Sequence, residues 1–219
     1  MVPVPRVSRA TGCTRGLDGA GRWIGRHWLA LMNLFWGAYV GLALVAPILM
    51  LLGWTGPAKA IYLAYRPACH QRPERSFFLG GPQGTYSARE LAAMGIDVDP
   101  QARAIGSSGA GYKVAVCERD TALYGSVFAC GVAYAIFRKG MRRIRIPLWA
   151  ALLFLAPLAV DGTLQLLGVY ESTWLLRSLT GAIFGVGPVL LTYPLLDESL
   201  GQPNPSPAPA RVDRNQSAL

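Results

Sequence analysis

Charged residues are scarce in this 219-residue chain: aspartate, glutamate, lysine and arginine make up 15% of it, against 52% for hydrophobic residues. A soluble domain interrupts its hydrophobic runs with polar residues every few positions. Here four runs approach the roughly 20 residues that a helix needs to cross about 30 Å of hydrocarbon. The scarcity of charge therefore excludes an ordinary soluble domain, and the length fits a single domain.

Motifs of several protein classes are also missing. The chain has C-x-x-D where a thiol oxidoreductase has C-x-x-C, and it has no G-x-S-x-G segment around a serine nucleophile. No internal repeat of the transporter kind is visible. The first hydrophobic run, from Trp28 to Gly53, is too long for a signal peptide and lacks a small-residue cleavage site.

Positive charge dominates, with a formal net charge of +9, but it is clustered. One cluster precedes the first hydrophobic run and the other follows the second; they comprise Arg6, Arg9, Arg15, Arg22, Arg26, Arg138, Lys139, Arg142, Arg143 and Arg145. Such clusters mark cytoplasmic ends of transmembrane helices. They do not form a stripe, so nucleic acid is not an expected partner, whereas a lipid bilayer is.

The expected fold is an all-α integral membrane protein with four transmembrane helices and a long irregular extracytoplasmic loop. The predicted segments are a basic cytoplasmic tail (1–27), helices at 28–53, 121–137, 147–168 and 174–196, the loop at 54–120, and a disordered cytoplasmic tail (197–219). The protein is then expected in a bacterial inner membrane, with both termini in the cytoplasm. The short link between the last two helices predicts an antiparallel hairpin.

Four shorter patterns carry local predictions. Ser87 and Glu90 have capping-box spacing and predict a short helix over 87–94. Gly37 and Gly41 form a G-x-x-x-G pair that permits close helix approach, and Pro47 predicts a kink. The semi-apolar stretch Lys59–Tyr65 is expected to lie along the membrane surface.

Polar residues from four segments are expected to meet at the outer face. The candidate ligand-binding residues are His70, Gln71, Glu74, Arg75, Arg119, Tyr124, Asp161, Gln165, Glu171, Arg177 and Thr180. Asp161 lies about 20 Å along its helix, inside the hydrocarbon, where an ionised group costs around 2.5–3.5 kcal/mol and needs a partner. Arg177 is the expected partner. The pair would either only fix the helix hairpin or form the floor of a cavity that the Cys-His segment covers.

Two cysteines are expected in the same region. Cys69 and Cys117 could form a disulfide, since the outer compartment is oxidising. They could instead bind a divalent metal such as zinc together with His70 and Asp120. A third interpretation leaves both thiols unpaired. Cys13 and Cys130 are isolated and expected to be inert.

Five spaced motifs carry a resemblance. They are Cys69-His70-Gln71 with Pro73-Glu74-Arg75-Ser76-Phe77, Cys117-x-Arg119, Asp161-Gly162 with Gln165, Glu171-Ser172 with Leu176-Arg177, and Thr180-Gly181. In this order they resemble an uncharacterised bacterial membrane-protein family, domain of unknown function 2085, over about Ala60 to Leu196.

The resemblance implies no activity. Many members carry a second cysteine at the position of Asp120, so this chain departs from an all-thiolate pattern, although an aspartate can also bind metal. The stretch 79–112 resembles an insertion relative to shorter members.

The functional hypothesis is a membrane-embedded binding module, with an outward-facing polar pocket for a metal ion or a small polar ligand. It would act alone, as a homo-oligomer, or as an accessory subunit of a larger membrane complex. Two alternatives stay open: an outer-leaflet enzyme, either a hydrolase or a thiol oxidoreductase, and a small-solute transporter that works as an oligomer.

Overall fold

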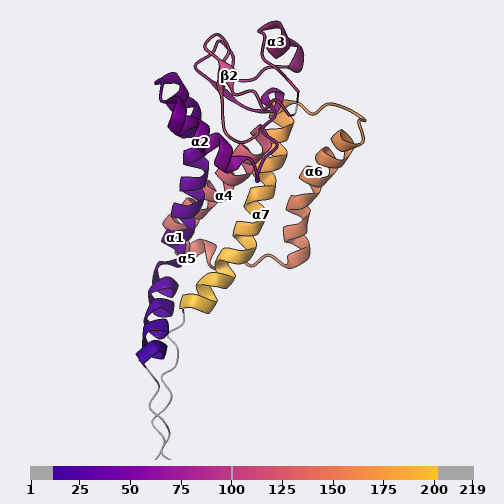
Figure 1. The fold of residues 1–219 in the computed structure, drawn as a ribbon. Coiled ribbons are helices and arrows are strands. Elements are labelled where there is room, and N and C mark those ends of the chain that lie inside the picture. Colours follow the sequence, from indigo (N-terminus) through magenta and orange to yellow (C-terminus); the bar gives the residue numbers. More distant parts are fainter. Residues whose placement is uncertain (1–11, 100, 202–219) are drawn as a thin grey trace, which may run out of the picture.

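The computed structural model describes residues 12–99 and 101–201, and this part of the chain is mostly helical. The long helices are α1 (Gly12–Leu51), α4 (Glu118–Ile136), α6 (Leu148–Leu166) and α7 (Trp174–Gly201). The short elements are α2 (Thr55–Tyr65), α3 (Ala88–Ala93), α5 (Arg138–Met141), the 3₁₀ helix η1 (Pro73–Arg75), and the strands β1 (Phe78–Leu79), β2 (Gly106–Ser107) and β3 (Gly111–Lys113). Figure 1 shows the long helices side by side, with the short elements at one end except for α5, which lies toward the other end.

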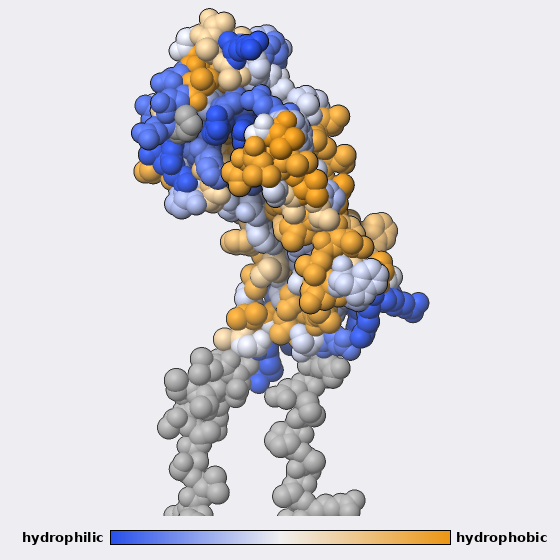
Figure 2. Space-filling model, turned by 90° about the vertical axis from the view of Figure 1, so that its right-hand side faces the viewer, coloured by the Kyte–Doolittle hydropathy of each residue, from blue (hydrophilic) through white to orange (hydrophobic). Residues whose placement is uncertain are grey.

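Three helices of the described part are long and apolar enough to cross a membrane: α1 from Gly19, α6, and α7 up to Leu200. Their surfaces carry large exposed apolar side chains, such as Leu152 and Val160 of α6. Figure 2 shows apolar residues over the body of the molecule and hydrophilic residues gathered at its upper end. A helical membrane protein is therefore supported, with three of the four expected spans meeting these criteria.

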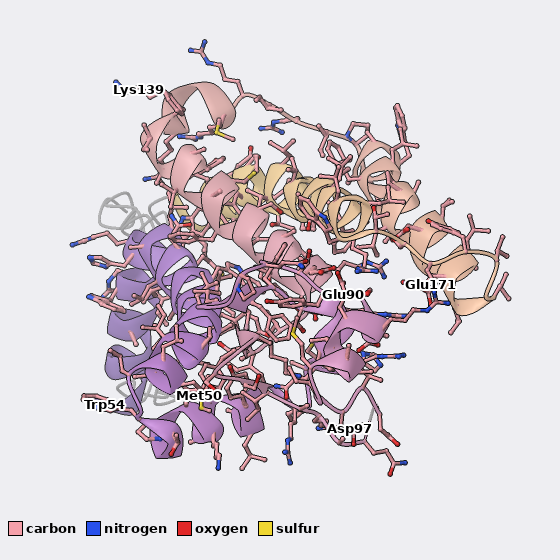
Figure 3. All side chains as sticks on the ribbon, turned by 90° about the horizontal axis from the view of Figure 1, so that it is seen from above. Met50, Trp54, Glu90, Asp97, Lys139 and Glu171 are labelled. Atoms are coloured by element: carbon pink, nitrogen blue, oxygen red, sulfur yellow. The ribbon has the colours of Figure 1, made fainter. Side chains whose placement is uncertain are left out.

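The fourth expected span is α4, which is not among the three. Its first turn holds Glu118, Arg119 and Asp120, and its buried positions include Gly131 and Tyr134. Seen from above, α4 and α7 lie between α1 and α6 (Figure 3). The most polar helix of the bundle is thus the one that its neighbours shield.

Small residues let α7 approach α4 closely. A Cβ atom on Gly181 would lie 2.5 Å from the Arg119 carbonyl oxygen, and one on Gly185 would lie 2.0 Å from Ser126 Oγ. In α1, a Cβ on Gly37 would lie 2.7 Å from the Phe128 ring, whereas Gly41 has no such neighbour within 4 Å. The predicted Gly37–Gly41 pair therefore contributes one contact, and the G-x-x-x-G pair that packs two helices is Gly181–Gly185.

Pro47 leaves one backbone carbonyl group of α1 without its usual hydrogen-bond donor. Proline has no N–H, so the carbonyl of Ala43 lacks its usual donor four residues later. The backbone N–H of Ala115 donates to that carbonyl at 3.2 Å. The carbonyl that the proline leaves free thereby binds the segment before α4 to α1.

Helix α2 folds back along α1 instead of leading into an irregular loop. The Tyr65 hydroxyl donates to the Tyr39 carbonyl, and Ala58 and Tyr62 are buried in one core with Ala43 and Ala46. The expectation that Lys59–Tyr65 lies along the membrane surface stays a prediction. Apolar residues on one face of α2 find their partner on α1.

The segment 66–116, here called the cap, is also more ordered than expected. Its antiparallel sheet has the order β1-β3-β2, with Phe78 opposite Lys113 and Gly106 opposite Tyr112. The predicted capping box of α3 is confirmed, since Glu90 N–H donates to Ser87 Oγ at 3.3 Å and Ser87 N–H to Glu90 Oε2 at 2.7 Å. The cap is therefore folded, and the prediction of an irregular loop is wrong.

The opposite end of the bundle has its own polar contacts. Asp197 of α7, which is 2% exposed, accepts from Arg138 Nε at 3.1 Å and from the Tyr134 hydroxyl at 3.4 Å. Arg145 pairs with Glu198 at 3.0 Å. These contacts hold the end of α7 against the basic segment after α4.

Candidate functional site

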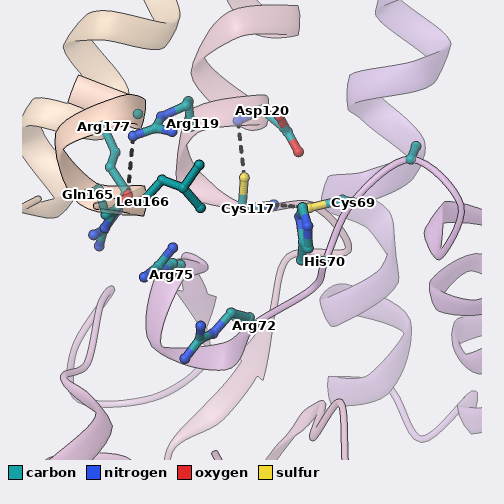
Figure 4. Close-up of a pocket in the computed structure, with 12 residues that line it drawn as sticks. Cys69, His70, Arg72, Arg75, Cys117, Arg119, Asp120, Gln165, Leu166 and Arg177 are labelled. Carbon is teal, nitrogen blue, oxygen red and sulfur yellow. Dashed lines mark hydrogen bonds between the residues drawn. The ribbon is translucent and has the colours of Figure 1, made fainter. Parts of the chain in front are cut away.

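A cavity of about 560 Å³ lies where α4 and α7 begin and α6 ends, under the first residues of the cap. Its lining combines sulfur, carboxylate and guanidinium groups: Ala68, Cys69, His70, Arg72, Arg75, Cys117, Arg119, Asp120, Gly162, Gln165, Leu166 and Arg177. Figure 4 shows the cysteines and Asp120 at one end and Arg75, Arg119, Gln165 and Arg177 at the other. The two ends are described in turn as the sulfur end and the arginine end.

At the sulfur end, ligand atoms of Cys69, Cys117 and Asp120 all lie within 4.8 Å of one another. Cys117 is the N-cap of α4, and its sulfur accepts from the Asp120 N–H at 3.4 Å. The Cys69 sulfur accepts from the Cys117 N–H at 3.2 Å. Both sulfurs therefore lie at the positive end of a helix dipole, which favours negative charge on them.

The two thiols interact directly. Both are free cysteines, as is Cys130 in the described part of the chain. A hydrogen bond from Cys117 lowers the pKa of the Cys69 thiol, and the same hydrogen bond raises the pKa of the Cys117 thiol. Cys69 is thus the thiol that ionises first, with Cys117 as its donor.

Gln71 fixes the chain beside Cys69 and does not line the cavity. Its side-chain amide is 2% exposed and donates to the carbonyls of Tyr62 at 2.7 Å and Ala115 at 3.0 Å. Its own carbonyl accepts from the fully buried ammonium of Lys113. Burial lowers the pKa of Lys113 to about 8. This network ties α2, β3 and the Cys69 segment together, so Gln71 positions the site.

Two buried ion pairs bridge the helices at the arginine end. Arg119 of α4 pairs with Asp161 of α6, and Arg177 of α7 pairs with Glu118 of α4 through Nε and Oε2 at 2.7 Å. The Tyr170 hydroxyl also donates to Asp161. The predicted pair between Asp161 and Arg177 is therefore wrong, because α4 supplies a partner to each of them, Arg119 to Asp161 and Glu118 to Arg177.

Arg75 stands apart from these pairs. Arg72 contacts Glu74, so three of the four arginines that line the cavity have a carboxylate partner. Among residues 12–99 and 101–201, no carboxylate oxygen lies within 4.0 Å of the Arg75 guanidinium and no hydrogen bond from its side chain is formed. Burial and the neighbouring Arg72, Arg177 and Arg119 lower the pKa of Arg75.

A second cavity of about 460 Å³ adjoins the first on the side of the cap. The two share Arg72, Arg75, Gln165 and Arg177, and Glu74 and Glu171 line only the second. The predicted residues of η1 and of the α6–α7 link therefore surround one continuous polar region.

The remaining predicted residues are placed differently. His70 is exposed and lines the cavity, but it is not part of the group formed by Cys69, Cys117 and Asp120. Tyr124 stacks on Trp36 at 5.4 Å between α4 and α1, and the Thr180 hydroxyl donates within its own helix to Leu176 O at 2.9 Å. Neither of these two lines either cavity.

Four residues of the site were missed: Arg72, Lys113, Glu118 and Tyr170. Glu118 stands between Cys117 and Arg119 in a run of polar residues, and this run was a usable signal. Nothing in the sequence around Lys113 marks it as buried, because its burial depends on pairing between β1 and β3.

Residues 107–191 match the family described as predicted membrane protein (DUF2085), which confirms the resemblance carried by the motifs. The matched segment includes Cys117, Asp120 and the helices α4 and α6, and it begins after Cys69. A relative described as uncharacterized protein MJ1492, from Methanocaldococcus jannaschii, is 29% identical over 181 residues, which cover 80% of this chain and 96% of the relative. No solved structure matches the chain.

Proposed function

We propose that this protein is a membrane-embedded metal-binding module, with Cys69, Cys117 and Asp120 as the metal ligands. The proposal rests on one observation: two sulfurs and a carboxylate, from the Cys69 segment and from the start of α4, converge within 4.8 Å. Zinc lies about 2.3 Å from cysteine sulfur and about 2.0–2.2 Å from carboxylate oxygen, so neighbouring ligands in a tetrahedral site lie about 3.7 Å apart. Small side-chain movements would bring the three groups to that spacing.

The chemistry of the donors fits a borderline-soft divalent ion. Two thiolates and a carboxylate together carry three negative charges, and the helix dipole of α4 favours their ionised forms. Three protein ligands leave one tetrahedral position free, as in zinc sites that accept a water or a substrate. His70 is near enough in sequence to be tested as a fourth ligand, and its exposure argues against a structural role.

Metal content and thiol protection test this function. We expect the purified protein to carry about one equivalent of metal, and its Cys69 and Cys117 to alkylate only after chelation. Cys117→Ser should lose the metal, whereas Cys130→Ser, a change at a cysteine within α4 and away from the cavity, should retain it. A protein without metal whose two thiols are released by reductant alone would show a disulfide and contradict the proposal.

We also propose that α4 is a fourth membrane span, with both termini in the cytoplasm and the cavity facing outward. The basic segment 138–145 supports this orientation. Cysteines introduced at Gly84 and Gly140, where an added Cβ meets no atom within 4 Å, should be labelled from outside and from inside, respectively, in intact cells. Labelling of both from outside would contradict the orientation.

A further inference from the structure

The arginine end of the cavity holds one cation that no protein group neutralises. Arg119, Arg177 and Arg72 are matched by Asp161, Glu118 and Glu74, and Arg75 has no such partner in the described part of the chain. The remaining carboxylate of the lining, Asp120, belongs to the sulfur end. Arg75 is therefore the arginine of this end without an ion-pair partner in the described residues.

Two residues that line the cavity also have hydrogen-bond donors without an acceptor. Arg119 Nε and Gln165 Nε2 are buried without an acceptor, although both residues line the cavity. The Gln165 side-chain oxygen accepts from Arg119 at 3.5 Å, which leaves its amide N–H groups free. A buried donor without an acceptor is unfavourable, so an acceptor that comes within reach of these donors would stabilise the protein.

The rim of the cavity is apolar on the side of α6. Leu166 lines the cavity and is 86% exposed, and Leu167 and Val169 follow it with 70% and 65% exposure. Side chains of this kind belong in lipid. The arginine end thus lies at a border between hydrocarbon and a polar space, which is where the phosphodiester groups of phospholipids also lie.

We infer that the arginine end binds a phosphodiester anion, with Arg75 as the residue that carries its charge. A phosphodiester has one negative charge, which would pair with the single positive charge of Arg75, and its oxygens accept hydrogen bonds from the paired N–H groups of a guanidinium. The inference rests on the proposed role of the cavity as a ligand pocket, but it does not need the metal. A phospholipid headgroup and a soluble phosphodiester share this chemistry.

Binding to the purified full-length protein in neutral detergent tests the inference. One arm adds phosphatidylglycerol and the other adds glycerophosphoglycerol, and each measures the dissociation constant and the shift in melting temperature. We expect at least one probe to bind. Binding in the lipid arm alone identifies a membrane ligand, and binding in both arms identifies the phosphodiester itself as the recognised group.

Three variants make the result specific to Arg75. Arg75→Gln should weaken binding at least tenfold, Arg75→Lys should weaken it less, and Arg89→Gln, at an exposed arginine of α3 outside both cavities, should not weaken it. Without a probe, Arg75→Gln should be no less stable than the parent protein, because Arg75 has no protein partner to lose. No binding of either probe, or equal weakening by Arg89→Gln, would overturn the inference.

Metal content separates this inference from the proposed function. Arg75→Gln should keep its metal, and Cys117→Ser should keep its phosphodiester binding. A parent protein that binds a phosphodiester but carries no metal would remove the metal site and leave the anion site in place.

Discussion

The two ion pairs that α4 forms with α6 and α7 have a direct thermodynamic consequence. Glu118 and Arg177 are paired, with side chains that are 1% and 11% exposed, whereas Asp161 pairs with Arg119. Replacing one partner of a buried pair leaves the other charge uncompensated and costs about 3–5 kcal/mol. Glu118→Gln and Arg177→Met are therefore each expected to lower the free energy of unfolding by about that amount.

The double variant should be much less damaged than the sum of the two. Removing both partners leaves no uncompensated charge, so the coupling free energy between Glu118 and Arg177 is expected to be about 2–3 kcal/mol. Arg119 is 21% exposed, so its coupling to Asp161 should be smaller, about 1–2 kcal/mol. Asp161 and Arg177 form no ion pair with each other, so their coupling should be smaller than that between Glu118 and Arg177.

Reversible titration with SDS in mixed micelles, followed by tryptophan fluorescence, measures these free energies. The matched control is a cycle between Arg177→Met and Arg145→Gln, since Arg145 pairs with Glu198 at the opposite end of the bundle. That control should be additive. A coupling between Asp161 and Arg177 that equals or exceeds the coupling between Glu118 and Arg177 would refute Glu118 as the partner of Arg177.

Two further predictions concern packing and pH. Gly185→Ala should lower the free energy of unfolding by about 1–3 kcal/mol, because its Cβ would lie 2.0 Å from Ser126 Oγ. Gly41→Ala should have little effect, because its Cβ would have no atom within 4 Å. Equal effects of the two changes in the same SDS titration would contradict the α4–α7 contact. Lys113 has a pKa of about 8 in the folded protein against 10.5 in the unfolded chain. The unfolded chain therefore binds more protons between these two pH values, and the free energy of unfolding should rise with pH across that window. The expected rise is up to about 3 kcal/mol relative to the variant Lys113→Met. An identical pH dependence of the two proteins would show that Lys113 is not buried as described.

The sequence predicted the helical class well because hydrophobic runs report burial in lipid directly. It also predicted that Cys69, Cys117 and Asp120 belong to one region, since the order of the helices alone places them at one end. The partner of Asp161 could not be predicted in the same way. That choice depends on the rotation of α4, which is set by contacts with Gly181 and Gly185.

The folded cap was missed for a different reason. Its strands are two or three residues long, too short to show alternation, and they are held by pairing between β1 and β3 and by the buried Lys113. A sequence with many glycines also resembles a loop. Only the capping box of α3 gave a local signal strong enough to be read.

The free carbonyl of Ala43 has a consequence for how the protein is made. Helix α1 is synthesised first, and Pro47 leaves that carbonyl without a partner until Ala115 arrives from later in the chain. An unsatisfied backbone group in hydrocarbon costs several kcal/mol. A chain that ends before Ala115 therefore lacks the donor for this carbonyl, and the first helix is complete in its hydrogen bonds only after the cap has folded.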